Sequence, residues 1–447
     1  MAPARRWKGC SIRGAAGAGR WPYSAPMTTT PREKVSIPSD LRGASRLAAD
    51  ATVMLSHLVE TMHHNILRTP GVLGKATFAP TRGITGLVYR SVRGVTRLVG
   101  AGLDASLGAL QPRLGAGSSW RGRETVLAVL NGVLGDYLES SHNPLAIEMQ
   151  LRHEGEPLEL TKEGLAGALP LATGRIAVLL HGLCLSDRQW TRKGHDHGRQ
   201  LAQDLGYTPV YLRYNSGRHI SANGKQFAAL LEALIGHWPV PIEDFVIIGH
   251  SMGGLIARSA VHYGRRGRRA WPKRLRKLVF IGTPHHGAPL ERGGAWVHVL
   301  FGASPYTAAF ENLGRLRSAG ITDLRHGSLL EEDAASDDRF VPRPDRRNVV
   351  PLPAGVDCHA IAGLKGNSTT GAGARLIGDG LVPLASALGR HRDPERTLAF
   401  PDDHQWVGEK IGHLELLSSR RVYAQIRGWL EEGGAVRATT ATGSDTP

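Results

Sequence analysis

The chain has 447 residues, of which 41% are hydrophobic and 21% are charged, with a formal net charge of +16 and 3 cysteines. This apolar share is that of a globular protein and excludes full disorder. Three cysteines are too few for a disulfide-stapled scaffold or a multi-cysteine metal cluster, and no apolar run reaches the roughly 18 residues of a transmembrane helix. The length predicts two or three domains, or one large α/β domain with additions.

Two short segments carry most of the positive charge. Residues 1–50 hold nine basic and three acidic side chains, and residues 265–277 hold eight basic side chains and no acid. We interpret 265–277 as a solvated basic linker, with contact to anionic lipid headgroups as an alternative. Nucleic acid is the least favoured partner, because the chain has no zinc-finger spacing, basic-region heptads or RNP-like strand.

Residues 1–35 are predicted to form a disordered basic arm. Arg5 and Arg6 resemble a twin-arginine signal, but Arg13 and Arg20 interrupt the apolar core that such a signal requires. The sequence leaves the start of the chain open between Met1 and Met27. Since no signal is legible, we expect a cytoplasmic protein with at most peripheral contact with an anionic membrane.

Residues 36–142 are predicted to be an α-helical N-terminal region. Apolar side chains recur every three or four residues over 40–68, 84–107 and 126–137, which is the period of an amphipathic helix. The preferred interpretation is a bundle packed on the next domain. The alternative is a set of amphipathic helices that lie on a lipid surface.

Residues 143–432 are predicted to form an α/β domain. Short apolar runs alternate with helices of 10–15 residues, which indicates βαβ units and a parallel sheet. Residues 284–345 break this alternation and are predicted to be an insertion, and residues 433–447 are predicted to be a disordered tail. The expected strands are 146–152, 175–181, 208–214, 245–249, 277–282, 356–363 and 397–400; the expected helices are 194–206, 220–235, 253–263 and 414–430.

Ser251 is the predicted nucleophile. It lies in Gly249-His250-Ser251-Met252-Gly253-Gly254, between a buried strand pattern and an amphipathic helix. The G-x-S-x-G pattern alone is weak in a chain with 56 glycines, but this setting is the one that a nucleophile elbow requires. The glycines on either side of the motif are expected because strand and helix pass too closely for a Cβ. A plain turn with Ser251 as a helix N-cap is the alternative.

Three motifs in chain order resemble α/β-hydrolase lipases and esterases, in particular the PGAP1-like (GPI inositol-deacylase) and bacterial triacylglycerol lipase branch. They are His181-Gly182-Leu183, the serine motif, and Gly282-Thr283-Pro284-His285-His286-Gly287. The resemblance covers roughly 143–432 and implies an α/β-hydrolase fold: a mostly parallel sheet flanked by helices. It also implies a triad in the order Ser, Asp, His, and backbone N–H groups of Leu183 and Met252 as an oxyanion hole.

Asp379 and His413 are the predicted acid and base. Asp379 lies in Gly378-Asp379-Gly380, which resembles the D-G-x-V segment of these lipases, and His413 precedes the last predicted helix. Asp357 and Asp393 are weaker candidates for the acid, and His404 is the rival histidine. An aspartate in this role holds the histidine tautomer and offsets its charge during acyl transfer.

The remaining polar clusters suggest no cofactor and no metal site. His195 and His197 lack a third ligand at a useful spacing, so a solvated loop is the preferred interpretation. Cys184 and Cys358 are expected to be small core residues rather than a disulfide bridge. No glycine-rich phosphate loop or dinucleotide fingerprint occurs in the right context, so we expect no nucleotide cofactor.

The sequence therefore predicts a serine hydrolase that cleaves carboxylic esters through an acyl-enzyme. Lipid esters are the expected substrates, because the insertion 284–345 carries apolar residues suited to a lid. The first alternative is an acyltransferase with the same triad, and the second is a non-catalytic membrane-binding module. The sequence does not reveal the oligomeric state.

Overall fold

A computed structural model describes residues 37–68, 83–110, 123–288, 318–333, 347–366 and 378–440. The predicted arm 1–35 and most of the predicted insertion 284–345 lie outside these residues. The segment 433–447 was predicted to be disordered, but the last helix extends into it and ends at Thr440.

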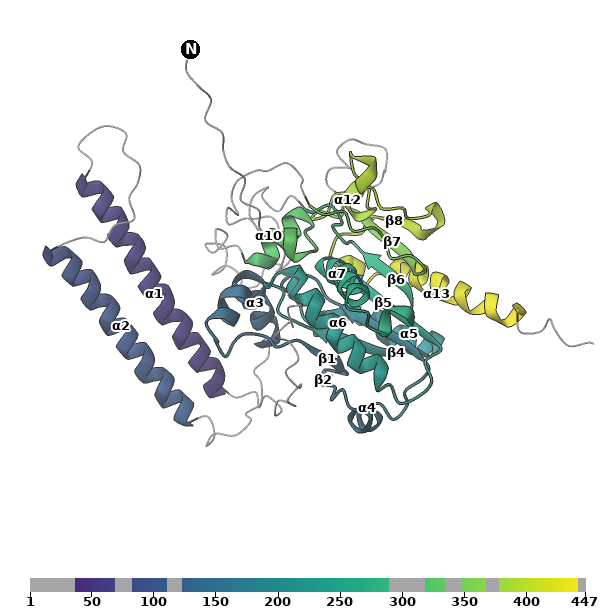
Figure 1. The fold of residues 1–447 in the computed structure, drawn as a ribbon, viewed down its shortest axis with the longest axis horizontal. Coiled ribbons are helices and arrows are strands. Elements are labelled where there is room, and N and C mark those ends of the chain that lie inside the picture. Colours follow the sequence, from purple (N-terminus) through teal and green to yellow (C-terminus); the bar gives the residue numbers. More distant parts are fainter. Residues whose placement is uncertain are drawn as a thin grey trace, which may run out of the picture.

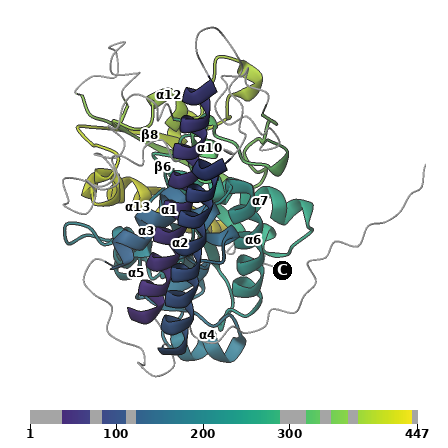
Figure 2. The same ribbon diagram turned by 90° about the vertical axis from the view of Figure 1, so that its left-hand side faces the viewer.

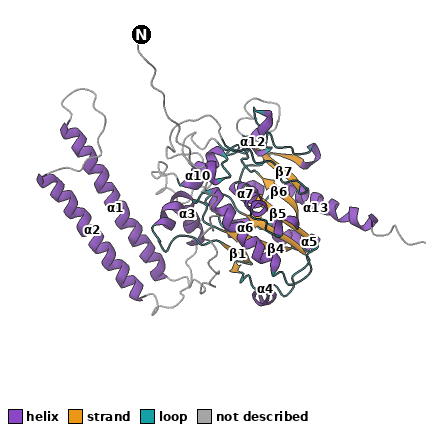
Figure 3. Cartoon of the chain, in the orientation of Figure 1, coloured by secondary structure: helices purple, strands orange, loops and turns teal. Residues whose placement is uncertain are grey.

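A sheet of eight strands forms the core of the α/β body, with α1 and α2 to one side of it (Figure 3). The strand order is β2-β1-β4-β3-β5-β6-β7-β8. The strands from β4 to β8 pair in parallel, and β1 pairs antiparallel with both β2 and β4. The strands are β1 (Gln150–His153), β2 (Glu156–Pro157), β3 (Arg175–Leu180), β4 (Thr208–Arg213), β5 (Asp244–His250), β6 (Leu275–Ile281), β7 (Asp357–Leu364) and β8 (Gln405–Glu409).

Helices cover both faces of this sheet, which confirms the predicted α/β architecture. Side chains of α6 and α7 pack on one face with Ile176 and Val178, and those of α5 and α13 pack on the other with Ala177 and Leu179. Because successive strand residues point to opposite faces, a sheet buried on both sides needs such continuous apolar runs. The bounds are α4 (Lys162–Ala168), α5 (His197–Leu205), α6 (Ile220–Gly236), α7 (Met252–Arg266), α10 (Ala319–His326), α12 (Leu384–Ala387) and α13 (Arg420–Thr440).

The last strand is not where the sequence predicted it. Residues 397–400 are not a strand, and β8 forms at Gln405–Glu409 instead. The N–H of Leu398 donates to the carbonyl of Gly389, and that of Phe400 donates back to Leu398. Leu398 and Phe400 are both buried, so their alternation reflects the packing of a folded loop rather than a sheet edge.

Three helices precede the sheet, and two of them project from the body as a hairpin (Figures 1 and 2). They are α1 (Ile37–Arg68), α2 (Gly83–Leu110) and α3 (Arg123–Ser140). Arg42 and Arg46 of α1 pair with Asp104 of α2 and hold the hairpin together. The predicted packing on the domain is wrong for α2, because most of its periodic apolar residues are exposed: Val88, Val92, Val95, Val99 and Leu103.

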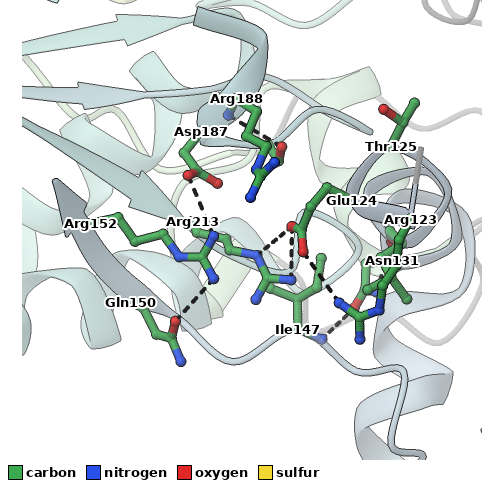
Figure 4. Close-up of polar contacts among 12 residues, drawn as sticks. Arg123, Glu124, Thr125, Asn131, Ile147, Gln150, Arg152, Asp187, Arg188 and Arg213 are labelled. Carbon is green, nitrogen blue, oxygen red and sulfur yellow. Dashed lines mark hydrogen bonds and ion pairs between the residues drawn. The ribbon is translucent and has the colours of Figure 1, made fainter. Parts of the chain in front are cut away.

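In contrast to α2, α3 packs against the domain (Figure 4). Glu124 of α3 accepts hydrogen bonds from Arg213 of β4 at 3.2 Å, and Arg123 pairs with Asp40 of α1. The amide oxygen of the fully buried Asn131 accepts from the N–H of Ile147 at 2.8 Å. These contacts satisfy the polar groups at the junction and so fix α3 against the start of the domain.

The basic run 265–277 lies at the edge of the sheet where β6 begins, as the chain order predicted. Most of its side chains are exposed, but Lys277 is 6% exposed and donates to the carbonyl of Trp429. The solvated-linker interpretation is therefore wrong for Lys277. Within the described residues, no helix is both long and apolar enough to cross a membrane.

Candidate active site

Ser251 occupies a sharp turn between β5 and α7. Its backbone has φ 53° and ψ −123°, and its N–H donates to the carbonyl of Ile281 in β6 at 2.8 Å. A non-glycine residue with positive φ is strained, and such strain persists where the surroundings hold it. Helix α7 begins at the next residue, Met252, so Ser251 sits at the carboxyl edge of the parallel sheet, as the elbow interpretation expected.

Two glycines make this turn possible, as the sequence indicated. A Cβ on Gly249 would lie 2.6 Å from the backbone of Gly254, and one on Gly253 would lie 2.5 Å from the carbonyl oxygen of Leu180. Both distances are far below van der Waals contact. Strand β5, helix α7 and the end of β3 can therefore approach only because these residues lack side chains.

Asp379 and His413 form a buried pair. Nδ1 of His413 donates to Oδ2 of Asp379 at 2.7 Å, and each side chain is 1% exposed. Oδ1 of Asp379 accepts the N–H groups of Leu381 and Val382 at 3.0 and 2.9 Å. Because Nδ1 carries the proton in this bond, Nε2 of the neutral imidazole is left as the proton acceptor.

The loop after β6 brings this pair beside the serine. Ile281 binds Ser251, and a Cβ on the next residue, Gly282, would lie 3.1 Å from Oδ2 of Asp379 and 3.3 Å from Nδ1 of His413. Gly282 also has φ 57°. The three predicted residues therefore lie at one place on the carboxyl edge of the sheet, although they come from loops after β5, β7 and β8.

The rival candidates lie elsewhere. Nδ1 of His404 is 3.1 Å from the carbonyl of Cys358, and its ring stacks on His359 at 4.0 Å, which places it at the start of β7. Asp357 is the first residue of that strand, so both lie at the opposite edge of the sheet. Asp393 caps a short turn by accepting the N–H of Glu395.

The loop after β3 also reaches the serine. A Cβ on Gly182 would lie 3.0 Å from Cβ and 3.5 Å from Oγ of Ser251, so Leu183 follows a backbone that touches the nucleophile. His181 is 1% exposed, stacks on Tyr214 at 4.1 Å, and accepts the Tyr214 hydroxyl at its carbonyl at 2.6 Å. His181 thus holds the conformation of this loop.

His250 is a neighbour of the site that the sequence reading did not single out. Its Nε2–H donates to the carbonyl of His413 at 3.1 Å, and the two ring centroids are 4.8 Å apart. Burial, together with the facing His413, holds the pKa of His250 well below its usual range. A neutral His250 fixes the His413 loop without placing a second positive charge beside a protonated His413. The G-H-S triplet was the signal that could have revealed it.

The other predicted polar residues have structural contacts. His195 and His197 bond to each other at 2.8 Å, and Nε2 of His197 donates to the carbonyl of Leu416 at 2.9 Å. No cluster of three or more potential metal ligands occurs among the residues that the structure describes. Cys184 and Cys358 are buried free thiols, which confirms their predicted place in the core.

Comparison with known proteins agrees with this architecture. Residues 171–352 match the family described as PGAP1-like alpha/beta domain, which confirms the predicted resemblance for that part of the chain. A search of curated proteins found no match. The described chain thus has the predicted fold, a mostly parallel sheet flanked by helices and preceded by a helical region, and part of it matches this family.

Several solved structures share parts of the fold at low similarity. Lipase BlEst2 of Bacillus licheniformis in mature form has a TM-score of 0.36 and 19% identity over 60% of this chain and 92% of that one. Human thioesterase 2 has a TM-score of 0.32 and 12% identity over 58% of this chain and 94% of that one. Phospholipase PlaB of Legionella pneumophila has a TM-score of 0.31 and 18% identity over 48% of this chain and 44% of that one. At these values the activities of those proteins are not transferred to this chain.

Proposed function

We propose that this protein is a serine hydrolase that cleaves carboxylic esters, with Ser251 as nucleophile, His413 as base and then acid, and Asp379 as the group that orients the imidazole. The observation that carries the proposal is the strained serine at the strand–helix turn beside a buried His413–Asp379 pair. A serine hydroxyl is a poor nucleophile until a base removes its proton, and Nε2 of His413 is the available acceptor.

The proposed reaction has two halves. Oγ of Ser251 attacks the ester carbonyl as its proton passes to Nε2 of His413, and the N–H groups of Leu183 and Met252 stabilise the oxyanion. The protonated His413 then gives its proton to the leaving alcohol. Water, activated by the same imidazole, releases the acid from the acyl-enzyme. An acyltransferase would use an alcohol in place of water in this second half.

Labelling with a fluorophosphonate probe tests the proposed nucleophile. We expect the wild type to be labelled and Ser251→Ala to be unlabelled. Ser140→Ala is the control, because Ser140 is exposed at the end of α3 and its hydroxyl donates to the carbonyl of Tyr137 in its own helix. If folded wild-type protein resists the probe, the catalytic proposal is wrong and a binding module is the better account.

We further propose that the substrates are lipid esters, which the protein meets at an anionic membrane surface through α2. Seven aliphatic residues of α2 are 46–75% exposed: Leu87, Val88, Val92, Val95, Leu98, Val99 and Leu103. The same helix has the exposed Arg90 and Arg97, and its one acid, Asp104, is already paired with two arginines. An apolar face with basic residues and no free carboxylate suits anionic lipid.

Vesicle flotation tests this surface. We expect wild-type protein to float with vesicles that contain phosphatidylglycerol and Leu98→Glu to stay at the bottom of the gradient. Leu171→Glu is the matched control, because Leu171 is 89% exposed but lies in the domain rather than on α2. Equal flotation of both variants would contradict the proposal. Rates on esters of increasing acyl length test the substrate class, and a steady fall beyond butyrate would refute a lipid substrate.

A further inference from the structure

A recess with a polar lining lies near the loop that follows β6. It has a volume of ≈ 320 Å³ including the part open to solvent. No carboxylate occurs among its described lining residues, whereas three arginines and two histidines do. These five are Arg258, His285, His286, Arg347 and Arg396.

Arg258 is a buried guanidinium without a carboxylate partner among the described residues. It lies in α7 and is 5% exposed. One of its terminal nitrogens is 3.3 Å from Nδ1 of His285, and the other donates to the carbonyl of Val350. Its Nε–H is buried and finds no acceptor in the described part of the chain. A buried charge without a counterion is costly, so this position favours an anion.

His285 adds a second unpaired donor to the recess. It is 1% exposed, and burial, with Arg258 beside it, holds the pKa of its imidazole well below its usual range. An arginine can only donate, so Nδ1 of His285 must accept from Arg258 and Nε2 must carry the hydrogen. This Nε2–H is also buried, and the described residues offer it no acceptor.

The backbone fixes two further arginines at the recess. Arg347 donates to the carbonyl of Gly327 at 3.0 Å, and Arg396 donates to the carbonyl of Arg347 at 2.9 Å. Burial, with the nearby charge of Arg347, lowers the pKa of Arg258 to about 10. The positive charge of Arg347 therefore acts on the guanidinium of Arg258, and both residues line the recess, where a negative ligand would be attracted to them.

We propose that this recess is a binding site for a phosphate-type oxyanion, with Arg258, His285 and Arg347 as its ligands. The two groups that lack a partner among the described residues, Nε–H of Arg258 and Nε2–H of His285, are both donors, and the oxygens of a phosphate accept. Guanidinium groups match its geometry. The same chemistry has two sources, free phosphate or the phosphate of a lipid headgroup. Binding of a lipid headgroup as part of a substrate rests on the proposed hydrolase function, whereas binding of free phosphate does not.

Calorimetric titration of the full-length Ser251→Ala protein with inorganic phosphate tests the site independently of catalysis. We expect saturable binding that weakens on the order of tenfold or more in Arg347→Gln, since bonds to charged groups are the stronger hydrogen bonds. Arg258→Met should lose binding altogether, provided that circular dichroism shows a native fold. Arg266→Gln is the matched control, because Arg266 lies on the same helix with a 63% exposed side chain paired to Glu332.

Saturable binding that is weakened in Arg347→Gln and kept in Arg266→Gln supports the site. Binding that is absent, or equal in all folded variants, overturns it. This result is independent of the hydrolase proposal, because Ser251 is already removed. A wild-type enzyme that binds phosphate but cleaves no ester would refute the hydrolase proposal alone.

The source of the phosphate is decided by kinetics on a matched pair, dihexanoylphosphatidic acid and dihexanoylglycerol. If the headgroup is the natural ligand, the ratio of kcat/KM for the phosphorylated over the neutral ester falls about tenfold in Arg347→Gln and is unchanged in Arg266→Gln. Inorganic phosphate then competes with the phosphorylated ester. If phosphate binds but the ratio is the same in every variant, the site holds the free ion.

Discussion

Replacing Asp379 by asparagine is the sharpest test of the proposed triad, because the structure fixes how the new amide must lie. Oδ1 accepts two backbone N–H groups, from Leu381 and Val382. In Asp379→Asn the amide oxygen keeps these bonds, so the NH₂ group takes the place of Oδ2 and faces Nδ1 of His413. Turning the amide over would instead set the NH₂ against two N–H donors.

The exchanged group inverts the tautomer of the imidazole. Nδ1 of His413 then accepts from the amide, and Nε2 carries the hydrogen and cannot serve as a base. The productive tautomer would set two buried donors against each other. Each unpaired buried donor costs about 1–3 kcal/mol, so the pair costs about 2–6 kcal/mol. At about 1.4 kcal/mol per tenfold, we expect kcat/KM to fall ~30- to ~10⁴-fold.

The measurement is kcat/KM for p-nitrophenyl butyrate, with the fluorophosphonate labelling rate as a second readout. Asp393→Asn is the control, because Asp393 caps a short turn and its side chain contacts Glu395 and Arg396 of that turn, and it should retain wild-type activity. A folded Asp379→Asn enzyme within tenfold of the wild type would refute the assignment of Asp379. Loss of activity in both variants would show that the comparison reports stability and not the tautomer.

Three further outcomes are expected. Gly282→Ala should lower esterase activity strongly in folded protein, because its Cβ would lie 2.8 Å from Leu416 and 3.1 Å from Asp379 and so displace the His413–Asp379 pair. Gly355→Ala, which also has a positive φ but open space around it, should retain activity; equal activities would contradict this. Burial lowers the pKa of His181 to about 3. Its imidazole gains a proton near pH 6.5 only when unfolded, so the free energy of unfolding should fall as pH decreases from 6.5, by up to ~1.4 kcal/mol per unit. Urea unfolding midpoints that are constant from pH 7.5 to 4.5 would contradict this predicted loss of stability. Asp104→Asn should speed hydrogen exchange of α2 amides and leave β5 unchanged, because Asp104 joins α1 to α2; unchanged exchange in α2 would show that the hairpin does not depend on this pair.

The sequence by itself determined the layout of the domain and the serine turn. Short apolar runs predicted most strands, because a sheet buried on both faces requires them, and apolar residues at every third or fourth position predicted the helices. Gly249 and Gly253 were also predictable, because the close approach of strand and helix at the serine turn leaves no space for a Cβ. The alternation of apolar residues wrongly predicted a strand at 397–400, because Leu398 and Phe400 are buried inside a loop.

Only the tertiary structure shows which of the rival acids and histidines lie together. Asp379 and His413 are 34 residues apart, and sequence spacing gives no distance between loops that meet at one sheet edge. His404 is nearer in sequence to Asp379 but lies at the opposite edge. The exposed face of α2 and the unpaired donors of Arg258 and His285 also needed coordinates. Periodicity shows that a helix has an apolar side, and the sequence shows where the arginines are, but neither shows which residues contact them in the folded protein.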